Sequence, residues 1–198
     1  MYNRFNTYSK LLSQEHLKTF KKDNFFYKIS TALIVFNSSF KDEMVTFATC
    51  DKYFEGVYLP KEEKIVLCSN ALYHYSEFKD AIQRQLIKMY DHKWSENYSF
   101  SNCKHLACSE IWAANFHSKC SISTRRGSKF KTQKHKLEVD SANEYCVRDL
   151  AINYLKERDK CEMKAEKYVD FVWASCYNDY SPLSDDRIDK ARSLTKIL

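Results

Sequence analysis

Two segments of the chain carry residue types that could do chemistry. In AIQRQLIKMYDHKW, residues 81–94, the side chains Arg84, Gln85 and Lys88 have the spacing of a zinc-protease motif. That motif places two His at i and i+4 of one helix, which bind the ion, and a Glu between them, which activates the metal-bound water. A second segment, CKHLACSEIWAANFHSKC at 103–120, looks like the other half of such a site.

The residues at the three motif positions cannot do what this chemistry needs. Arg84 and Lys88 are cations at neutral pH, so they offer a metal no lone pair and would repel it. Gln85 is an amide, which cannot accept a proton as a general base does. Glu110 of the second segment keeps a carboxylate. We therefore predict a degenerate site, composed of these four residues, that binds no metal and no other cofactor.

A displaced metal site is the alternative for the same region. His74, His92, His105 and His117 could combine with Glu110 to hold an ion. No two of these His have a tight ligand spacing, and single His on helices more often cap the helix or make a hydrogen bond. A phosphate-binding loop is not expected, because the chain has only two Gly.

The cysteines predict disulfides. None of them forms a C-x-x-C pair, which argues against zinc ribbons and thioredoxin-like redox sites. Buried free Cys is the alternative, since Cys packs like a small apolar residue. An even number spread along the chain favours a disulfide framework and an oxidising compartment, with the connectivity left open. The candidates are Cys50, Cys68, Cys103, Cys108, Cys120, Cys146, Cys161 and Cys176.

A basic run at 125–136, RRGSKFKTQKHK, contains six cations and no acid. An anionic lipid surface or an RNA backbone would suit it, and a solvated loop is the simpler alternative. Nucleic acid is not expected, because Phe130 is the one aromatic residue in the run. The predicted lipid contacts are Arg125, Arg126, Lys129, Lys131, Lys134 and Lys136.

The composition predicts an ordered and mainly helical protein. The chain has 198 residues, of which 44% are hydrophobic and 29% charged, which suits a buried core rather than disorder. Gly and Pro number two each, so there are few turn residues and long helices are favoured over many short strands. The longest apolar run, TALIVF at 31–36, is far shorter than the roughly 20 residues that cross a bilayer, so we expect no transmembrane segment.

The elements that must position the site follow from hydrophobic periodicity. Helices are predicted at 9–22, 77–93, 103–117, 141–157, 161–177 and 185–197. Short strands are predicted near 45–50, 56–59 and 64–68, and a polar loop at 119–140. The predicted fold class is α+β, mainly helical, with the strands before the helix that carries Arg84.

Four segments in fixed order resemble a known family. They are LIKMYDH at 86–92, HLACSEIWAANFHSKC at 105–120, CVRDLA at 146–151 and CYNDYSPL at 176–183. Together they resemble the mitochondrial inner-membrane zinc metalloproteases that mature and help to assemble ATP synthase in the intermembrane space. The resemblance covers roughly residues 50–183.

The resemblance implies a zincin-like fold, with short strands preceding the former active-site helix. It places the His-Glu-x-x-His motif of the family at Arg84, Gln85 and Lys88, and it makes Glu110 the counterpart of a third zinc ligand. The chain thus resembles a degenerate member. We expect Arg84 or Lys88 to pair with Glu110 in place of the ion.

The resemblance also divides the chain. We predict an N-terminal helical extension at 1–45, a degenerate zincin-like domain at 46–183 and a C-terminal amphipathic helix at 184–198. The C-terminal tail, the N-terminal helix or both are expected to lie mainly against other chains. The predicted location is the intermembrane-space face of the mitochondrial inner membrane.

The function predicted from these observations is not enzymatic. The chain is expected to be a catalytically inactive metalloprotease homologue, acting as an accessory subunit or assembly factor of a respiratory-chain or ATP synthase complex. Its partners would be other subunits of that complex and a cardiolipin-containing surface. The alternatives are a zinc metalloprotease with substitute ligands and an RNA-associated mitochondrial subunit.

Overall fold

The structure is a computed structural model that describes residues 2–50, 54–95, 97–120 and 133–179. Side chains are described from residue 9 onward and, in the last segment, from residue 143. The chain divides after residue 96 into two compact units, of which the second spans Asn97–Asp179. Each unit has its own elements and its own contacts.

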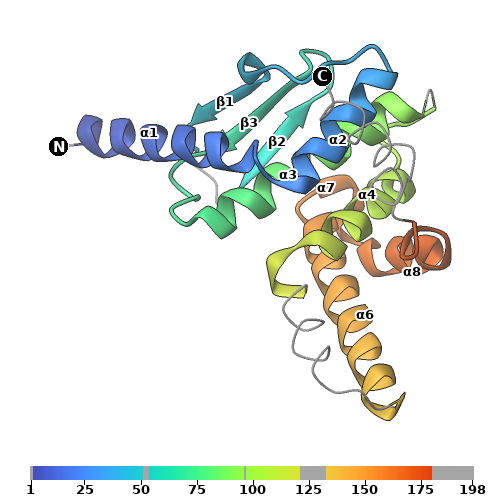
Figure 1. Ribbon diagram of the computed structural model, residues 1–198. Helices are drawn as coiled ribbons and strands as arrows, with labels where there is room; N and C mark the ends of the chain where they lie inside the picture. Colours follow the sequence, from blue (N-terminus) through green and yellow to red (C-terminus); the bar gives the residue numbers. More distant parts are fainter. Residues whose placement is uncertain (1, 51–53, 96, 121–132, 180–198) are drawn as a thin grey trace, which may run out of the picture. The chain divides into compact units, whose positions relative to one another are not determined.

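A three-stranded sheet forms the centre of the first unit. Its strands are β1 (Val45–Ala48), β2 (Gly56–Leu59) and β3 (Lys64–Cys68). β3 lies between the other two, parallel to β1 and antiparallel to β2, so β2 is an edge strand (Figure 1). A Cβ atom at Gly56 would lie 2.7 Å from the Val66 carbonyl oxygen, so a side chain at this position would force β2 and β3 apart. The three predicted strands are confirmed.

Three helices accompany the sheet: α1 (Tyr2–Phe20), α2 (Asn24–Val35) and α3 (Tyr75–Trp94). α3 packs against β2, β3, α1 and α2 (Figure 1). Asp23 begins α2, because its side chain accepts a hydrogen bond from the Phe25 N–H at 2.8 Å. Lys79 of α3 pairs with Asp23 at 2.7 Å, so the N-terminus of α2 is tied to α3.

The apolar face of α1 is used within its own unit. Leu17 is 7% exposed and Phe20 is fully buried, and the Phe20 ring meets that of Phe78 in α3 at 6.5 Å. These two residues of α1 therefore pack inside the first unit, whereas Leu11 on the same helix is 56% exposed, and the prediction that the tail, this helix or both lie against other chains stays a prediction. An intramolecular partner was available because α3 presents a whole apolar face of its own.

The second unit is helical. It contains α4 (Cys103–Phe116), α6 (Gln133–Lys156), α7 (Asp159–Glu162) and α8 (Ala165–Cys176). α4 packs against α6 and α8, and its predicted core residues Ala107, Ile111 and Ala114 are all fully buried. α6 and α8 complete one apolar core with it.

Four disulfides confirm the cysteine prediction and supply the connectivity that the sequence left open. Cys50–Cys68 joins the end of β3 to the residues after β1. The second unit holds Cys103–Cys161, Cys108–Cys176 and Cys120–Cys146, which join α4 and the residues that follow it to α7, α8 and α6. No cysteine is free.

Three helix predictions need correction. α2 was missed, because its apolar run TALIVF was judged only as a possible membrane span. α6 begins at Gln133, inside the predicted loop, because charged helix formers extend it beyond the part with apolar periodicity. The predicted helix at 161–177 is divided by Met163 and Lys164, where Lys164 has φ −129° and ψ 19°.

The fold class is confirmed as α+β and mainly helical, with the strands before α3. None of the described helices combines the length and the apolar content that crossing a bilayer requires. The predicted helix at 184–198 lies outside the described residues. The domain boundaries at 45 and 183 stay predictions.

Candidate functional site

The helix α3 carries Arg84, Gln85 and Lys88. It begins with a reciprocal cap, in which Glu77 Oε2 accepts hydrogen bonds from the backbone N–H groups of Tyr73 (3.1 Å) and His74 (3.0 Å). It ends at Trp94 with basic residues in its last turn, which suits the helix dipole.

The centre of α3 is buried on every side. The predicted core residues Phe78, Ile82, Leu86 and Met89 are fully buried, as expected from their spacing. The residues at the three motif positions are buried as well: Arg84 is 2% exposed, Gln85 0% and Lys88 1%. Two cations in such a place are unusual, since buried charges are costly unless they are paired.

Gln85 serves as a hydrogen-bond acceptor for the sheet. Its Oε1 accepts from the backbone N–H of Tyr58 at 3.0 Å. Tyr58 lies in the edge strand β2, so this N–H is satisfied by a side chain of α3 instead of by a further strand. Gln85 Nε2 is buried and has no hydrogen-bond partner among the described residues. Gln85 therefore has a structural role at the position where the zinc-protease motif has its general base.

A second link joins β2 to the end of α3. Tyr58 Oη and His92 Nδ1 lie 3.2 Å apart, and Glu63 forms an ion pair with Lys93. Burial, followed by the nearby Glu63 carboxylate, raises the pKa of Tyr58 to about 12, so the phenol stays protonated. Burial and then Lys93 lower the pKa of His92, while Glu63 opposes them.

The depressed pKa of His92 predicts a pH-dependent stability. Folding disfavours the charged imidazole, so the unfolded chain binds the proton first as the pH falls below its ordinary pKa of 6.5. The contribution of His92 to the free energy of unfolding should thus be fully present above pH 6.5. It should be lost as the pH falls below 6.5 and through the lower pKa of the folded state. Urea unfolding at several pH values measures this. His92→Gln should flatten the profile and His74→Asn, at an exposed site, should not. Equal profiles for the parent and His92→Gln would contradict the prediction.

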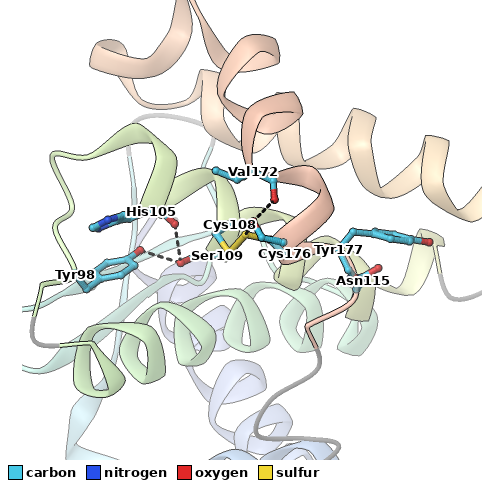
Figure 2. Close-up of a disulfide and its surroundings, with 9 residues drawn as sticks. Tyr98, His105, Cys108, Ser109, Asn115, Val172, Cys176 and Tyr177 are labelled. Atoms are coloured by element: carbon cyan, nitrogen blue, oxygen red, sulfur yellow. Dashed lines mark hydrogen bonds between the residues drawn. A yellow bond between two sulfur atoms is a disulfide. The ribbon is translucent and has the colours of Figure 1, made fainter.

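The helix α4 carries the second half of the predicted site. It begins at Asn102, whose side chain accepts a hydrogen bond from the Lys104 N–H at 3.0 Å. Figure 2 shows how its middle is held: Cys108 is joined to Cys176 of α8, and Ser109 Oγ lies 2.9 Å from Tyr98 Oη. The next residue, Glu110, is fully buried. These contacts fix the turn that carries the carboxylate.

Beyond Glu110, the end of α4 is also tied to the last residues of the unit. Asn115 Nδ2 donates to the Tyr177 carbonyl oxygen at 3.0 Å, as Figure 2 shows, and Asn143 Nδ2 donates to the Tyr177 hydroxyl at 3.1 Å. Asn115, the last residue of the AAN part of this segment, thus has a structural role: it holds the end of α4 against Tyr177. The sequence did not predict that Tyr58 and Tyr98 hold residues of the site. Tyr58 lies 27 residues from Gln85 and Tyr98 lies 11 residues from Ser109, and no short motif connects either pair.

The pairing of Arg84 or Lys88 with Glu110 stays a prediction. Arg84 and Lys88 belong to the first unit and Glu110 to the second, and all three are buried. Removing one member of a buried pair costs about 3–5 kcal/mol. Two double-mutant cycles, which combine Glu110→Gln with Lys88→Met and with Arg84→Met, would measure the coupling, and additive effects in both cycles would contradict the prediction.

The residues at the motif positions do not fit a zinc ion. Two of them are cations, and the oxygen of the third is taken by Tyr58. Among the described residues, no group of three or more His, Cys, Asp or Glu side chains is placed to hold a metal ion. We therefore assign no catalytic step to a metal.

The histidines of the alternative metal site have other duties. His74 begins α3, His92 contacts Tyr58, His105 Nδ1 accepts from the Ser99 N–H, and His117 Nδ1 accepts from the Lys119 N–H. No group of three or more possible ligands is placed to hold a metal ion among the described residues, so the displaced site is not supported by them. The lipid candidates at 125–136 lie where side chains are not described.

Comparisons with known proteins give a consistent result. The model of the peptidase M76 family matches residues 11–184. A Xenopus laevis protein named mitochondrial inner membrane protease ATP23 homolog is 33% identical over 144 residues, which is 72% of this chain and 59% of that protein. The Danio rerio homolog of the same name is 35% identical over 145 residues, 72% of this chain and 54% of that protein.

A yeast relative extends the comparison beyond vertebrates. The Saccharomyces cerevisiae (strain ATCC 204508 / S288c) protein named mitochondrial inner membrane protease ATP23 is 34% identical over 155 residues, 75% of this chain and 65% of that protein. The chain therefore spans less than two thirds of the length of each of these relatives. No solved structure matches the chain.

The names of these relatives correct the functional prediction. The chain was expected to be an inactive homologue that serves as a subunit or assembly factor and is not an enzyme. Relatives that are 33–35% identical over most of the chain are named proteases, so that prediction is wrong. The prediction of inactivity was based on Arg84, Gln85 and Lys88 alone. The chemistry of these three side chains says nothing about the other residues that a protease could use.

Proposed function

The chain belongs to the peptidase M76 family, and from this premise we propose that it acts as a protease at the mitochondrial inner membrane. The observation that carries the proposal is its identity of 33% over 144 residues with a relative named as a mitochondrial inner membrane protease. Because the chain spans only 59% of that relative's length, the activity and substrates of this chain are proposals.

The names of the relatives and the disulfides both support the predicted location. The names give the mitochondrial inner membrane, which confirms the predicted location. The chain contains four disulfides and no free cysteine. Disulfides persist in oxidising compartments, which agrees with the intermembrane-space side and not with a reducing one.

Glu110 is our candidate for the carboxylate that the reaction uses. It is fully buried, and the Cys108–Cys176 disulfide and the Ser109–Tyr98 contact hold its helical turn in place. A buried carboxylate on a fixed turn is suited to acid–base work, because its position is set before substrate arrives. Gln85 is excluded from the same role by its bond to Tyr58.

The substrates and partners we propose are proteins of the inner membrane. The resemblance names ATP synthase subunits as the first to test. We propose in addition that the basic run at 125–136 contacts anionic lipid, with cardiolipin as the first candidate, because six cations without an acid attract such a surface.

A peptide-mapping experiment tests the protease proposal. The oxidised chain would be incubated with proteins extracted from mitochondria that lack it, and newly formed N-termini would be identified by mass spectrometry. The parent chain should generate specific new N-termini. Glu110→Gln should lose them, whereas Glu162→Gln, a matched change at an exposed site of α7, should keep them.

Each outcome of this experiment decides something. If the parent chain yields no new N-termini, with and without added zinc, the proposal is overturned. If Glu110→Gln cleaves as the parent does, Glu110 is not the reacting carboxylate. Loss with a chelator and recovery with zinc would show that substitute ligands exist.

A further inference from the structure

The ends of α2 and α3 meet in an exposed apolar cap, formed by Ile34, Val35, Phe36 and Trp94. Ile34 is 61% exposed, Val35 75% and Trp94 61%. The Phe36 and Trp94 rings meet edge to face at 5.5 Å, which brings the two helix ends together (Figure 1). Ile34 and Val35 directly precede Phe36 in the chain, so large exposed apolar side chains gather where the two helices end, which suggests an interaction surface.

The exposure is built into the fold. α2 ends in a Schellman arrangement, in which the Asn37 N–H donates to the Ile34 carbonyl (3.0 Å) and the Ser38 N–H donates to the Leu33 carbonyl (3.1 Å). Asn37 has the left-handed conformation, with φ 54°, that this ending requires. The last turn of α2 is therefore fixed, and Ile34 and Val35 cannot turn inward without breaking these bonds.

The side chain of Trp94 is held by a neighbouring ring. Its ring stacks on Tyr90, one turn earlier in α3, with centroids 6.0 Å apart and an angle of 21° between the planes. Tyr90 is 4% exposed, so it forms the base on which the indole rests. The cap thus has an aliphatic pair and an indole held at one end of the unit, and none of its residues carries a charge.

We propose that this cap inserts into the surface of a phospholipid bilayer. Aliphatic side chains suit the acyl region, and Trp is favoured at the boundary between headgroups and acyl chains, because one edge of its ring is apolar and the other donates a hydrogen bond. The relatives are named as inner-membrane proteins, which gives the cap a bilayer to meet. The inference rests on the proposed location and not on proteolysis.

Vesicle flotation tests the cap directly. The oxidised chain would be floated with vesicles of phosphatidylcholine, and of phosphatidylcholine with cardiolipin, at low and high salt. Attachment through the cap should occur on both and persist at high salt, because apolar insertion is not screened. Ile34→Ser with Val35→Ser should weaken it about tenfold or more, which corresponds to about 1.4 kcal/mol. The control, Tyr145→Ser with Met163→Ser, changes residues that are 74% and 91% exposed and should float as the parent does.

A second measurement locates the contact. Lipids brominated along their acyl chains should quench the fluorescence of the parent, and the quenched part should be absent in Trp94→Phe. This change keeps an aromatic ring on Tyr90, so folding is not at risk. Absence of quenching, or equal flotation of the Ile34 and Val35 variant, would overturn the proposal. So would attachment that needs cardiolipin and disappears at high salt, which would point to the cations at 125–136.

Discussion

Reduction of the disulfides should unfold the second unit under conditions in which the oxidised chain is folded. Its three bridges close loops of 58, 68 and 26 residues by sequence separation. In the chain-entropy estimate, removing the 58-residue closure alone costs about 4 kcal/mol. Loss of all three is comparable with the whole stability of a domain, about 5–15 kcal/mol. Hydrogen exchange during reduction should show protection lost first in α4, α6 and α8.

The first unit provides the matched control for this prediction. Its one bridge, Cys50–Cys68, closes 18 residues, so it constrains a shorter loop. Replacing Cys103 and Cys161 by Ser should lower the midpoint of thermal unfolding more than replacing Cys50 and Cys68. A reduced chain that keeps the exchange protection of the oxidised one would contradict the role given to these bridges, as would free thiols in the native protein.

Loss of the Gln85 side chain should destabilise the chain well beyond the loss of its volume. Gln85→Ala removes the acceptor of the Tyr58 N–H, which is then buried without a partner in an edge strand. An unsatisfied buried donor costs about 1–3 kcal/mol in addition to the cavity. The free energy of unfolding in urea measures this.

Gln83 allows the hydrogen bond to be separated from packing. It lies two residues earlier in the same helix and is 4% exposed, and its Oε1 has no hydrogen-bond partner among the described residues. Gln83→Ala should therefore cost the packing term alone. Equal losses for Gln83→Ala and Gln85→Ala would show that the bond to Tyr58 contributes nothing.

Local patterns carried most of the prediction of elements. The three strands and the core face of α3 depend on short-range alternation and on 3.6-residue spacing, which neighbouring residues display directly. α2 was missed for a related reason, because an apolar run of six residues is ambiguous until its cap at Asp23 is considered. The even number of cysteines predicted bridges, since pairing is a matter of count and compartment.

The sequence by itself determined most of the elements, the family resemblance and the chemical nature of Arg84, Gln85 and Lys88. Only the tertiary structure decided what these residues contact. The partner of Gln85 is a backbone N–H 27 residues away, and the cysteine pairs are separated by up to 68 residues. Such contacts form when packed helices and strands bring distant backbone together. No local spacing encodes them, because the chain between the partners can fold in many ways and the core selects one.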